Sequence, residues 1–500
     1  MKSHIPSRML VLGLLLLPGA LSAEEKAAKL QEQTANKAAA LPEAVTREGS
    51  VKIGGKVINY ELTAGSMRIE RDKQPADIFY VAYQRITDNP TVDRPVMFAF
   101  NGGPGSSAVW LHIGMLGPKI LNLPGDGTTA PKPPVTVRDN PQSLLDVCDL
   151  VFVDPVSTGY SRPGNEDKAK HFHGVDADIE ACGEFIRRWI TENDRWASPK
   201  YLLGESYGGI RVAGLAQYLQ SRHGMGLNGV VLLSVILDFA TIQGSNTGDL
   251  SHSIFLPAYA AVAHHHGKLE GDRDQLVDEA GKFAYGDYAS ALMKGVELDN
   301  ATKTEIAERL SSFSGIATEV WLRHNLRIQP TLFRAELLRD EGKTLGRFDG
   351  RVAWDNPDPT TDDARYDPSY SLALGAFSTA LKDYLGREIG YKLDEPYEIL
   401  TSKVHPWKWG RENTILDVSD RLATAMRDNP HLKVLVMSGH TDLATPPECV
   451  AYSLRHLHDL PAAQRDNIRT EYYEGGHMFY LNPPDLKKSR ADLLEFLESE

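Results

Sequence analysis

The stretch Gly204-Glu205-Ser206-Tyr207-Gly208 fits the pattern G-x-S-x-G. Residues 200–203 before it predict a short buried strand, and residues 210–222 after it predict a helix with one apolar face. A serine on such a sharp strand-to-helix turn is lifted out of the sheet, close to a helix N-terminus and open to substrate. Ser206 is therefore a candidate nucleophile, although a serine in an ordinary glycine-rich turn gives the same local pattern.

Short apolar runs typical of strands buried on both faces occur on either side of this turn. Helical patterns such as 175–192 lie between several of them, and this alternation predicts an α/β fold, with a mostly parallel central sheet and helices on both faces. Upstream, alternating apolar residues at 57–62 and 78–83 predict antiparallel strands. The buried runs are 96–100, 150–153, 201–203, 230–233 and 434–437.

The chain is expected to contain five segments. Residues 1–23 combine Lys2 and Arg8 with a short apolar run and a small-residue cleavage site, which is the pattern of a secretory signal peptide. We therefore expect an exported protein, periplasmic or secreted, with no membrane association once the signal is removed. The other segments are a flexible leader at 24–47, the first part of the core at 48–240, a mostly helical cap or insertion at 241–401 and the second part of the core at 402–500.

Composition narrows the classes of partner and cofactor. The 500 residues carry a formal net charge of −13 without an evident basic stripe, so no nucleic-acid partner is expected. The three cysteines allow one disulfide, but Cys148 and Cys182 lie in a predicted strand and helix, which favours buried thiols. The histidine clusters at 171–173 and 264–266 lack the ligand spacing of a zinc site, so no metal and no cofactor is expected.

Two residues downstream could complete a catalytic triad with Ser206. A serine hydroxyl needs a base to take its proton and a carboxylate to orient that base. Asp442 and His477 follow Ser206 in the order found in α/β-hydrolases, each on a turn after a predicted strand, and such turns meet at one edge of a parallel sheet. Asp442 could instead be an acid in a surface turn, and His440 is a rival base that its place beside Asp442 disfavours.

A glycine-rich loop, Asn101-Gly102-Gly103-Pro104-Gly105, follows the predicted strand 96–100. Glycines let backbone N–H groups approach a developing oxyanion, where one donor contributes about 3 kcal/mol. We expect the N–H groups of Gly103 and Tyr207 to form this oxyanion hole. Elsewhere, Trp407 and Trp409 are candidates either for lining a substrate pocket or for packing at the junction with the cap.

Four sequence blocks, in order over about 78–482, resemble the signatures of the serine carboxypeptidases, peptidase family S10. The loop 101–107 is similar to the family's N-G-G-P-G-C-S, and 204–209 is identical to its usual G-E-S-Y-G-G. The segment 140–161 resembles its block from N-P-x-S-W to D-x-P-x-G-T-G-F-S, and 475–478 resembles its G-x-G-H-M ending. The resemblance implies an α/β-hydrolase fold and removal of C-terminal residues from peptides through an acyl-enzyme.

Carried over residue by residue, the resemblance implies Ser206 as nucleophile, His477 as general base and acid, and Asp442 as the group that orients it. It also implies that Asn101, Gly102 and Glu205 bind the free C-terminal carboxylate of the peptide, with Glu205 protonated. Two ionised carboxyl groups cannot lie so close together, which favours an acidic working pH. Glu205 could instead be a structural carboxylate bonded to backbone N–H groups.

Two departures from the family pattern affect this carboxylate-binding network. Ala99 stands where the family usually has tryptophan, and Met115 stands where it has glutamate. A related serine esterase or acyltransferase on the same triad therefore remains an alternative. A non-catalytic binding protein on the same scaffold is a second alternative, which the intact triad residues disfavour.

Overall fold

The computed structural model describes residues 43–87, 94–244, 248–410 and 412–498. The predicted signal peptide at 1–23 and most of the predicted leader at 24–47 lie outside these residues. The last residues of the expected leader already belong to strand β1 (Val45–Ile53), because Val45 pairs with Ala64 of the next strand. No helix within the described ranges has the length and apolarity needed to cross a membrane.

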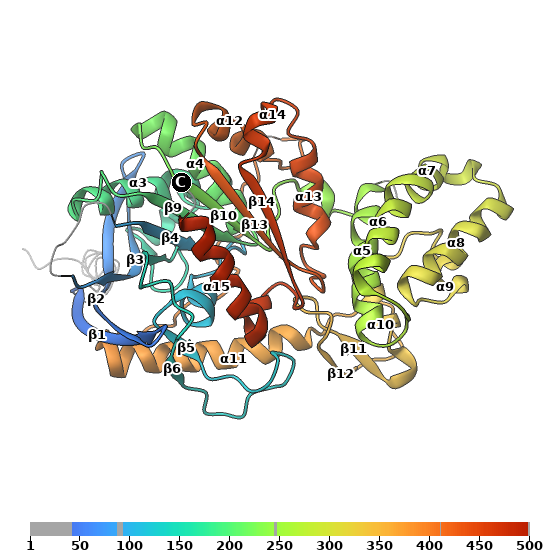
Figure 1. Cartoon of the computed structure of the whole chain (residues 1–500), viewed down its shortest axis with the longest axis horizontal. Helices are drawn as coiled ribbons and strands as arrows, with labels where there is room; N and C mark the ends of the chain where they lie inside the picture. Colours follow the sequence, from blue (N-terminus) through green and yellow to red (C-terminus); the bar gives the residue numbers. More distant parts are fainter. Residues whose placement is uncertain (1–42, 88–93, 245–247, 411, 499–500) are drawn as a thin grey trace, which may run out of the picture. The chain divides into compact units, whose positions relative to one another are not determined.

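A mixed, mostly parallel sheet forms the centre of the described chain (Figure 1). Its order is β1-β2-β3-β7-β4-β9-β10-β13-β14, with β8 pairing with β3. The strands from β7 to β14 are parallel, whereas β1, β2, β3 and β7 pair in antiparallel fashion. The α/β class and the antiparallel strands near the N-terminus are thus confirmed. The strands after β1 are β2 (Lys56–Arg71), β3 (Gln74–Arg85), β4 (Val96–Phe100), β7 (Asp149–Val153), β8 (Arg162–Pro163), β9 (Lys200–Glu205), β10 (Gly229–Leu233), β13 (Lys433–Gly439) and β14 (Ile468–Tyr473).

The helices cover both faces of this sheet, which explains its continuous apolar strands. Every residue of β4, β7, β9 and β10 is buried. Alternate side chains of these strands join two separate apolar clusters, one with Ala99 and Leu203, the other with Phe98 and Leu202. The first cluster includes α11 (Pro368–Asp383) and α15 (Pro483–Glu498); the second includes α3 (Val175–Glu192), α4 (Gly208–His223) and α12 (Ser419–Asp428).

The segment between β10 and β13 has two parts. Its helices from α5 to α10 enclose an apolar cluster of their own, centred on residues such as Tyr259, Trp321 and Phe333. Helix α11 lies in the expected insertion at 241–401, but its apolar face packs into the cluster beneath the central sheet. The helices of the first part are α5 (Leu250–His265), α6 (Arg273–Phe283), α7 (Ala289–Lys294), α8 (Asn300–Ser314), α9 (Thr318–Arg323) and α10 (Pro330–Glu336), followed by the hairpin β11 (Lys343–Leu345) and β12 (Ala353–Asp355).

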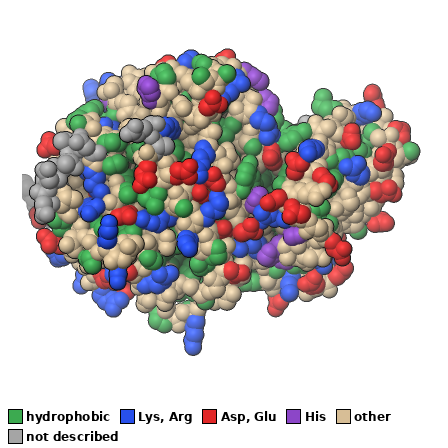
Figure 2. Space-filling model, viewed as in Figure 1, with side chains coloured by type: hydrophobic (Ala, Val, Ile, Leu, Met, Phe, Trp, Pro, Cys, Tyr) green, Lys and Arg blue, Asp and Glu red, His purple; other side chains and the backbone are tan. Residues whose placement is uncertain are grey.

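Besides short 3-10 and π-helical segments, the described chain contains further short helices and strands. They are α2 (Val109–Leu111), the pair β5 (Lys119–Leu121) and β6 (Val137–Asp139), α13 (Pro447–Arg455) and α14 (Ala462–Arg465). Basic and acidic side chains are interspersed over the face of the molecule shown in Figure 2. The loops that leave β4, β9, β13 and β14 all start at the carboxyl edge of the parallel strands, where such sheets bind their ligands.

Candidate active site

Ser206 occupies the sharp turn that the sequence predicts between β9 and α4. Its φ of +62° lies in the left-handed region that residues other than glycine rarely adopt. The turn is held because the Ser206 N–H donates to Leu233 O at 3.1 Å, and the Gly209 N–H donates to Ser206 O at 2.9 Å. A Cβ atom on Gly102 would lie 2.4 Å from Tyr207 N. The glycine loop after β4 can therefore lie directly against the nucleophile turn only because it carries no side chain there.

Asp442 and His477 meet although they are 35 residues apart in sequence. The His477 Nδ1 lies 2.8 Å from Asp442 Oδ2, and both side chains are buried. The other oxygen, Asp442 Oδ1, accepts the N–H groups of Ala444 at 2.7 Å and Thr445 at 3.0 Å. Burial lowers the pKa of His477, but the Asp442 carboxylate outweighs it, and the pKa is raised above its ordinary value. Since a carboxylate can only accept, Nδ1 carries the proton and Nε2 remains free to act as a base.

Thr445 is a further member of this arrangement that the sequence did not indicate. Its hydroxyl lies 3.0 Å from Asp442 Oδ2, 3.0 Å from His477 Nδ1 and 2.7 Å from the carbonyl of Ser234. The hydroxyl therefore ties the Asp442–His477 pair to the loop that leaves β10. Its position three residues after Asp442 is the one sequence signal that could have indicated it.

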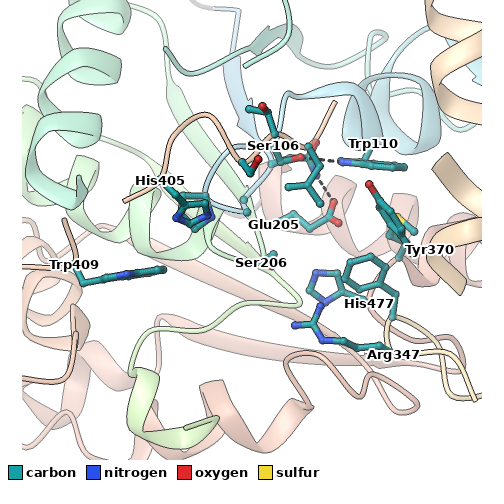
Figure 3. Close-up of a pocket in the computed structure, with 18 residues that line it drawn as sticks. Ser106, Trp110, Glu205, Ser206, Arg347, Tyr370, His405, Trp409 and His477 are labelled. Carbon is teal, nitrogen blue, oxygen red and sulfur yellow. Dashed lines mark hydrogen bonds between the residues drawn. The ribbon is translucent and has the colours of Figure 1, made fainter. Parts of the chain in front are cut away.

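A pocket of about 490 Å³ brings Ser206 and His477 together (Figure 3). Asp442 lies behind the histidine, fully buried. His440 does not line this pocket; it stacks on Tyr472 with ring centroids 5.3 Å apart, and burial lowers its pKa to about 4. The position of His440 thus argues against it as the base. The other predicted site residues that line the pocket are Asn101, Gly102, Gly103 and Glu205.

The two tryptophans have different environments. Trp409 lines the pocket, whereas Trp407 is buried with its ring centroid 5.7 Å from that of Tyr207. The first matches the pocket interpretation and the second the packing interpretation. Tyr207 itself is buried, and its backbone nitrogen lies close to Gly102.

Glu205 is a buried acid with two side-chain donors. Both Asn101 Nδ2, at 2.8 Å, and the Tyr480 hydroxyl, at 2.9 Å, donate to its Oε2 atom. Burial raises the pKa of Glu205 to about 7, so the neutral form prevails below that pH. Both donors come from side chains, so the alternative of a carboxylate held by backbone N–H groups does not describe its bonding.

The carboxylate network therefore differs in composition from the one the resemblance implies. Ala99 and Met115 are buried in the apolar cluster beneath the sheet and offer no polar atom to Glu205. Tyr480 supplies a donor that the sequence did not indicate, three residues after His477. Asn101 is held in turn by Arg211, whose Nη1 donates to the Asn101 carbonyl at 2.5 Å while its Nε pairs with buried Asp178 at 2.8 Å.

Other candidates from the sequence lie apart from this pocket. Cys148, Cys182 and Cys449 are free and buried, which confirms the expected thiols. Among the residues that the structure describes, no group of three or more His, Cys, Asp or Glu side chains is arranged to hold a metal ion. The candidate residues that line the pocket include Ser206, His477 and Glu205.

Similarity to known proteins agrees with this geometry. The family model of the serine carboxypeptidases matches residues 54–479. The serine carboxypeptidase-like proteins 45 and 8 of Arabidopsis thaliana are each 28% identical, over 37% and 32% of this chain. The matches span only 38% and 35% of those relatives' own lengths.

A solved structure shares the fold. The prohormone-processing carboxypeptidase KEX1 of Saccharomyces cerevisiae superposes with a TM-score of 0.54 at 14% identity, over 87% of this chain and 91% of that one. This similarity confirms the predicted α/β-hydrolase fold. The family match covers most of the sequence and includes all four of the blocks that resemble the family signatures. The chain therefore belongs to the serine carboxypeptidase family, S10.

Proposed function

We propose that this protein is an exported serine carboxypeptidase that removes C-terminal residues from peptides through an acyl-enzyme. The observation that carries the proposal is the 2.8 Å contact between Asp442 and His477, made at the wall of the same pocket that exposes Ser206. A base oriented by a buried carboxylate beside a serine on a strained turn is the arrangement that acyl transfer requires.

In the proposed reaction Ser206 Oγ attacks the last peptide carbonyl while His477 Nε2 takes its proton. The N–H groups of Gly103 and Tyr207 would receive the negative charge on the carbonyl oxygen. The C–N bond then breaks, His477 returns the proton to the leaving amine, and the C-terminal amino acid departs. Water then attacks the acyl-enzyme while His477 takes its proton. The ester bond breaks, His477 returns the proton to Ser206 Oγ, and the shortened peptide departs.

Specificity for chain ends would come from Asn101, Gly102 and Glu205. Asn101 and Tyr480 both donate to Oε2 of Glu205. The carbonyl oxygen is the better acceptor of a neutral acid, so the proton belongs on Oε1. An Oε1–H group at the pocket wall can donate to the C-terminal carboxylate of a peptide. This bonding supports Glu205 as a donor to substrate despite the altered positions 99 and 115.

Tyr480 should affect recognition of the C-terminal carboxylate and leave ester hydrolysis unchanged. Y480F removes one donor from Glu205 Oε2, so we expect kcat/KM for a blocked dipeptide with a free C-terminus to fall about fivefold, as for the loss of one buried hydrogen bond. The same variant should hydrolyse a simple ester at a rate within about twofold of wild type, because this bond serves only the recognition of a free C-terminus. Parallel losses on both substrates would indicate a general distortion of the pocket.

One experiment tests both catalysis and end recognition. Purified enzyme is given a blocked dipeptide, its C-terminal amide and a simple ester, and a fluorophosphonate probe is applied with S206A as the unlabelled control. We expect probe labelling of Ser206 and turnover of the free acid well above that of the amide. Absence of labelling would favour a binding protein, and equal turnover of all three would remove carboxylate recognition.

A serine esterase or acyltransferase is the second candidate function. It is favoured by Ala99 and Met115, since both are buried among apolar side chains and add nothing to carboxylate binding. Preferred turnover of the ester, or product formation only when an alcohol is added, would establish it. Export rests on residues 1–23, and recovery of a mature chain that begins near residue 24 from the periplasm or medium would test it.

A further inference from the structure

The hairpin loop between β11 and β12 lies against the two loops that carry Asp442 and His477. The N–H of His477 donates to Phe348 O at 2.5 Å, and the N–H of Gly350 donates to Thr441 O at 2.9 Å. The Phe348 ring also stacks on the imidazole of His477, with centroids 5.1 Å apart. A segment of the insertion is therefore fixed directly beside the proposed base.

Arg347 is anchored in this loop through its backbone. Its N–H donates to Asp367 Oδ1 at 3.0 Å, and its carbonyl accepts the N–H of Leu443 at 3.1 Å. The side chain is left free by these bonds and lines the Ser206 pocket beside His477 (Figure 3). Arg347 thus presents a guanidinium at a position set by the main chain.

The charge of Arg347 is not neutralised by the described part of the protein. Its guanidinium lies 5.4 Å from the centre of the Phe348 ring, and no ion pair joins it to any described carboxylate. By contrast, Arg351 in the same loop pairs with Asp349 at 2.7 Å. Arg347 is also the only lysine or arginine among the described residues that line the pocket.

Within the pocket, Glu205 does not supply the missing negative charge. Burial raises the pKa of this acid to about 7, so it is neutral below that pH, and its side-chain donors are Asn101 and Tyr480. In the proposed function Glu205 also binds the C-terminal carboxylate of the peptide, so that group is not available to Arg347. An unpaired guanidinium, which binds carboxylates in a bidentate manner, can then take a second carboxylate from the substrate.

We propose that Arg347 is a specificity-determining residue that selects peptides with an Asp or Glu side chain next to the scissile bond. This inference rests on the proposed carboxypeptidase function. A partly exposed charge pair at the edge of a pocket corresponds to about a tenfold preference for glutamate over its neutral isostere glutamine. The preference should weaken as salt is added.

The test compares kcat/KM for blocked dipeptides that carry Glu, Gln or Lys at the last or the penultimate position. Wild type should prefer Glu to Gln about tenfold at one of these positions. R347Q should bring that ratio close to one, and R347E should favour Lys. Because a ratio is measured, a general loss of turnover in the variants cancels. R365Q removes the same charge from a side chain that is 88% exposed and should keep the wild-type ratio.

Binding to S206A gives a second measurement that needs no turnover. Calorimetry with the Glu and Gln dipeptides should show the same preference in S206A and its loss in the double variant with R347Q. Wild type could turn over neutral peptides and yet show a Glu:Gln ratio near one at both positions. That result would overturn the role of Arg347 and leave the proposed function intact. An equal loss on all free acids in R347Q would also overturn it, since Arg347 would then bind the C-terminal carboxylate.

Discussion

Replacement of Asp442 by asparagine should lower kcat by roughly 10⁴-fold, the size of effect expected when the orienting acid of a triad becomes an amide. Asparagine Oδ1 would keep the N–H groups of Ala444 and Thr445, which now bind Asp442 Oδ1. Its NH₂ group would then face His477 Nδ1. Two donors cannot share one contact, so the imidazole would place its proton on Nε2 and lose the ability to accept the proton of Ser206.

The measurement is steady-state hydrolysis of a blocked dipeptide by D442N, with thermal unfolding to confirm that the variant is folded. D428N is the matched control, because it makes the same change of charge and shape at a site away from the pocket. Asp428 is exposed at the end of α12. The control should behave as wild type. A folded D442N that retains more than about a tenth of the wild-type kcat would contradict the assignment of Asp442.

Replacement of Glu205 by alanine should lower kcat/KM for free-acid peptides by about 100-fold, because a donor to substrate is lost and two buried partners, Asn101 and Tyr480, are left unsatisfied. E205Q is the informative counterpart. Both donors to Glu205 contact Oε2, so the glutamine oxygen can take that place and its NH₂ group can stand where Oε1–H stood. We therefore expect E205Q to stay within about tenfold of wild type at pH 5 to 6.

The pH dependence of turnover tests whether Glu205 acts in its protonated form. Its pKa is raised to about 7 by burial, so the acid is neutral below that pH and an anion above it. Free-acid turnover by wild type should fall as pH rises through about 7, whereas ester turnover should not. E205Q has no proton to lose at that position, so its free-acid turnover should not fall as pH rises through about 7. A wild-type alkaline fall that persists in E205Q would assign the titration to another group.

The fold could be predicted to a large extent because burial determines the pattern of its central strands. Strands β4, β7, β9 and β10 are buried on both faces, and such strands are continuous apolar runs in sequence. The division of the insertion was not predictable in the same way. Nothing local in the sequence tells which apolar partner helix α11 or the helices from α5 to α10 cover.

The catalytic candidates were predictable because order along the chain fixes them at one edge of the sheet. Asp442 and His477 each follow a strand, and the parallel register brings their loops together. Tyr480 and Arg347 were not predictable, because their contacts depend on the path of loops and on packing between distant segments. Thr445 was not predictable for a simpler reason: a threonine near an aspartate is common, and only its contacts with Asp442, His477 and the Ser234 carbonyl distinguish it.

The loop between β11 and β12 has a consequence for how the proposed enzyme could acquire new substrates. Its bonds to the catalytic loops at Arg347, Phe348 and Gly350 are made by main-chain N–H and carbonyl groups, which every amino acid except proline possesses. The side chain at position 347 can therefore be exchanged without releasing the loop from His477. Substitutions at position 347, in evolution or by design, can change which substrate side chains are bound. The backbone at this position would stay at the same distance from the catalytic residues.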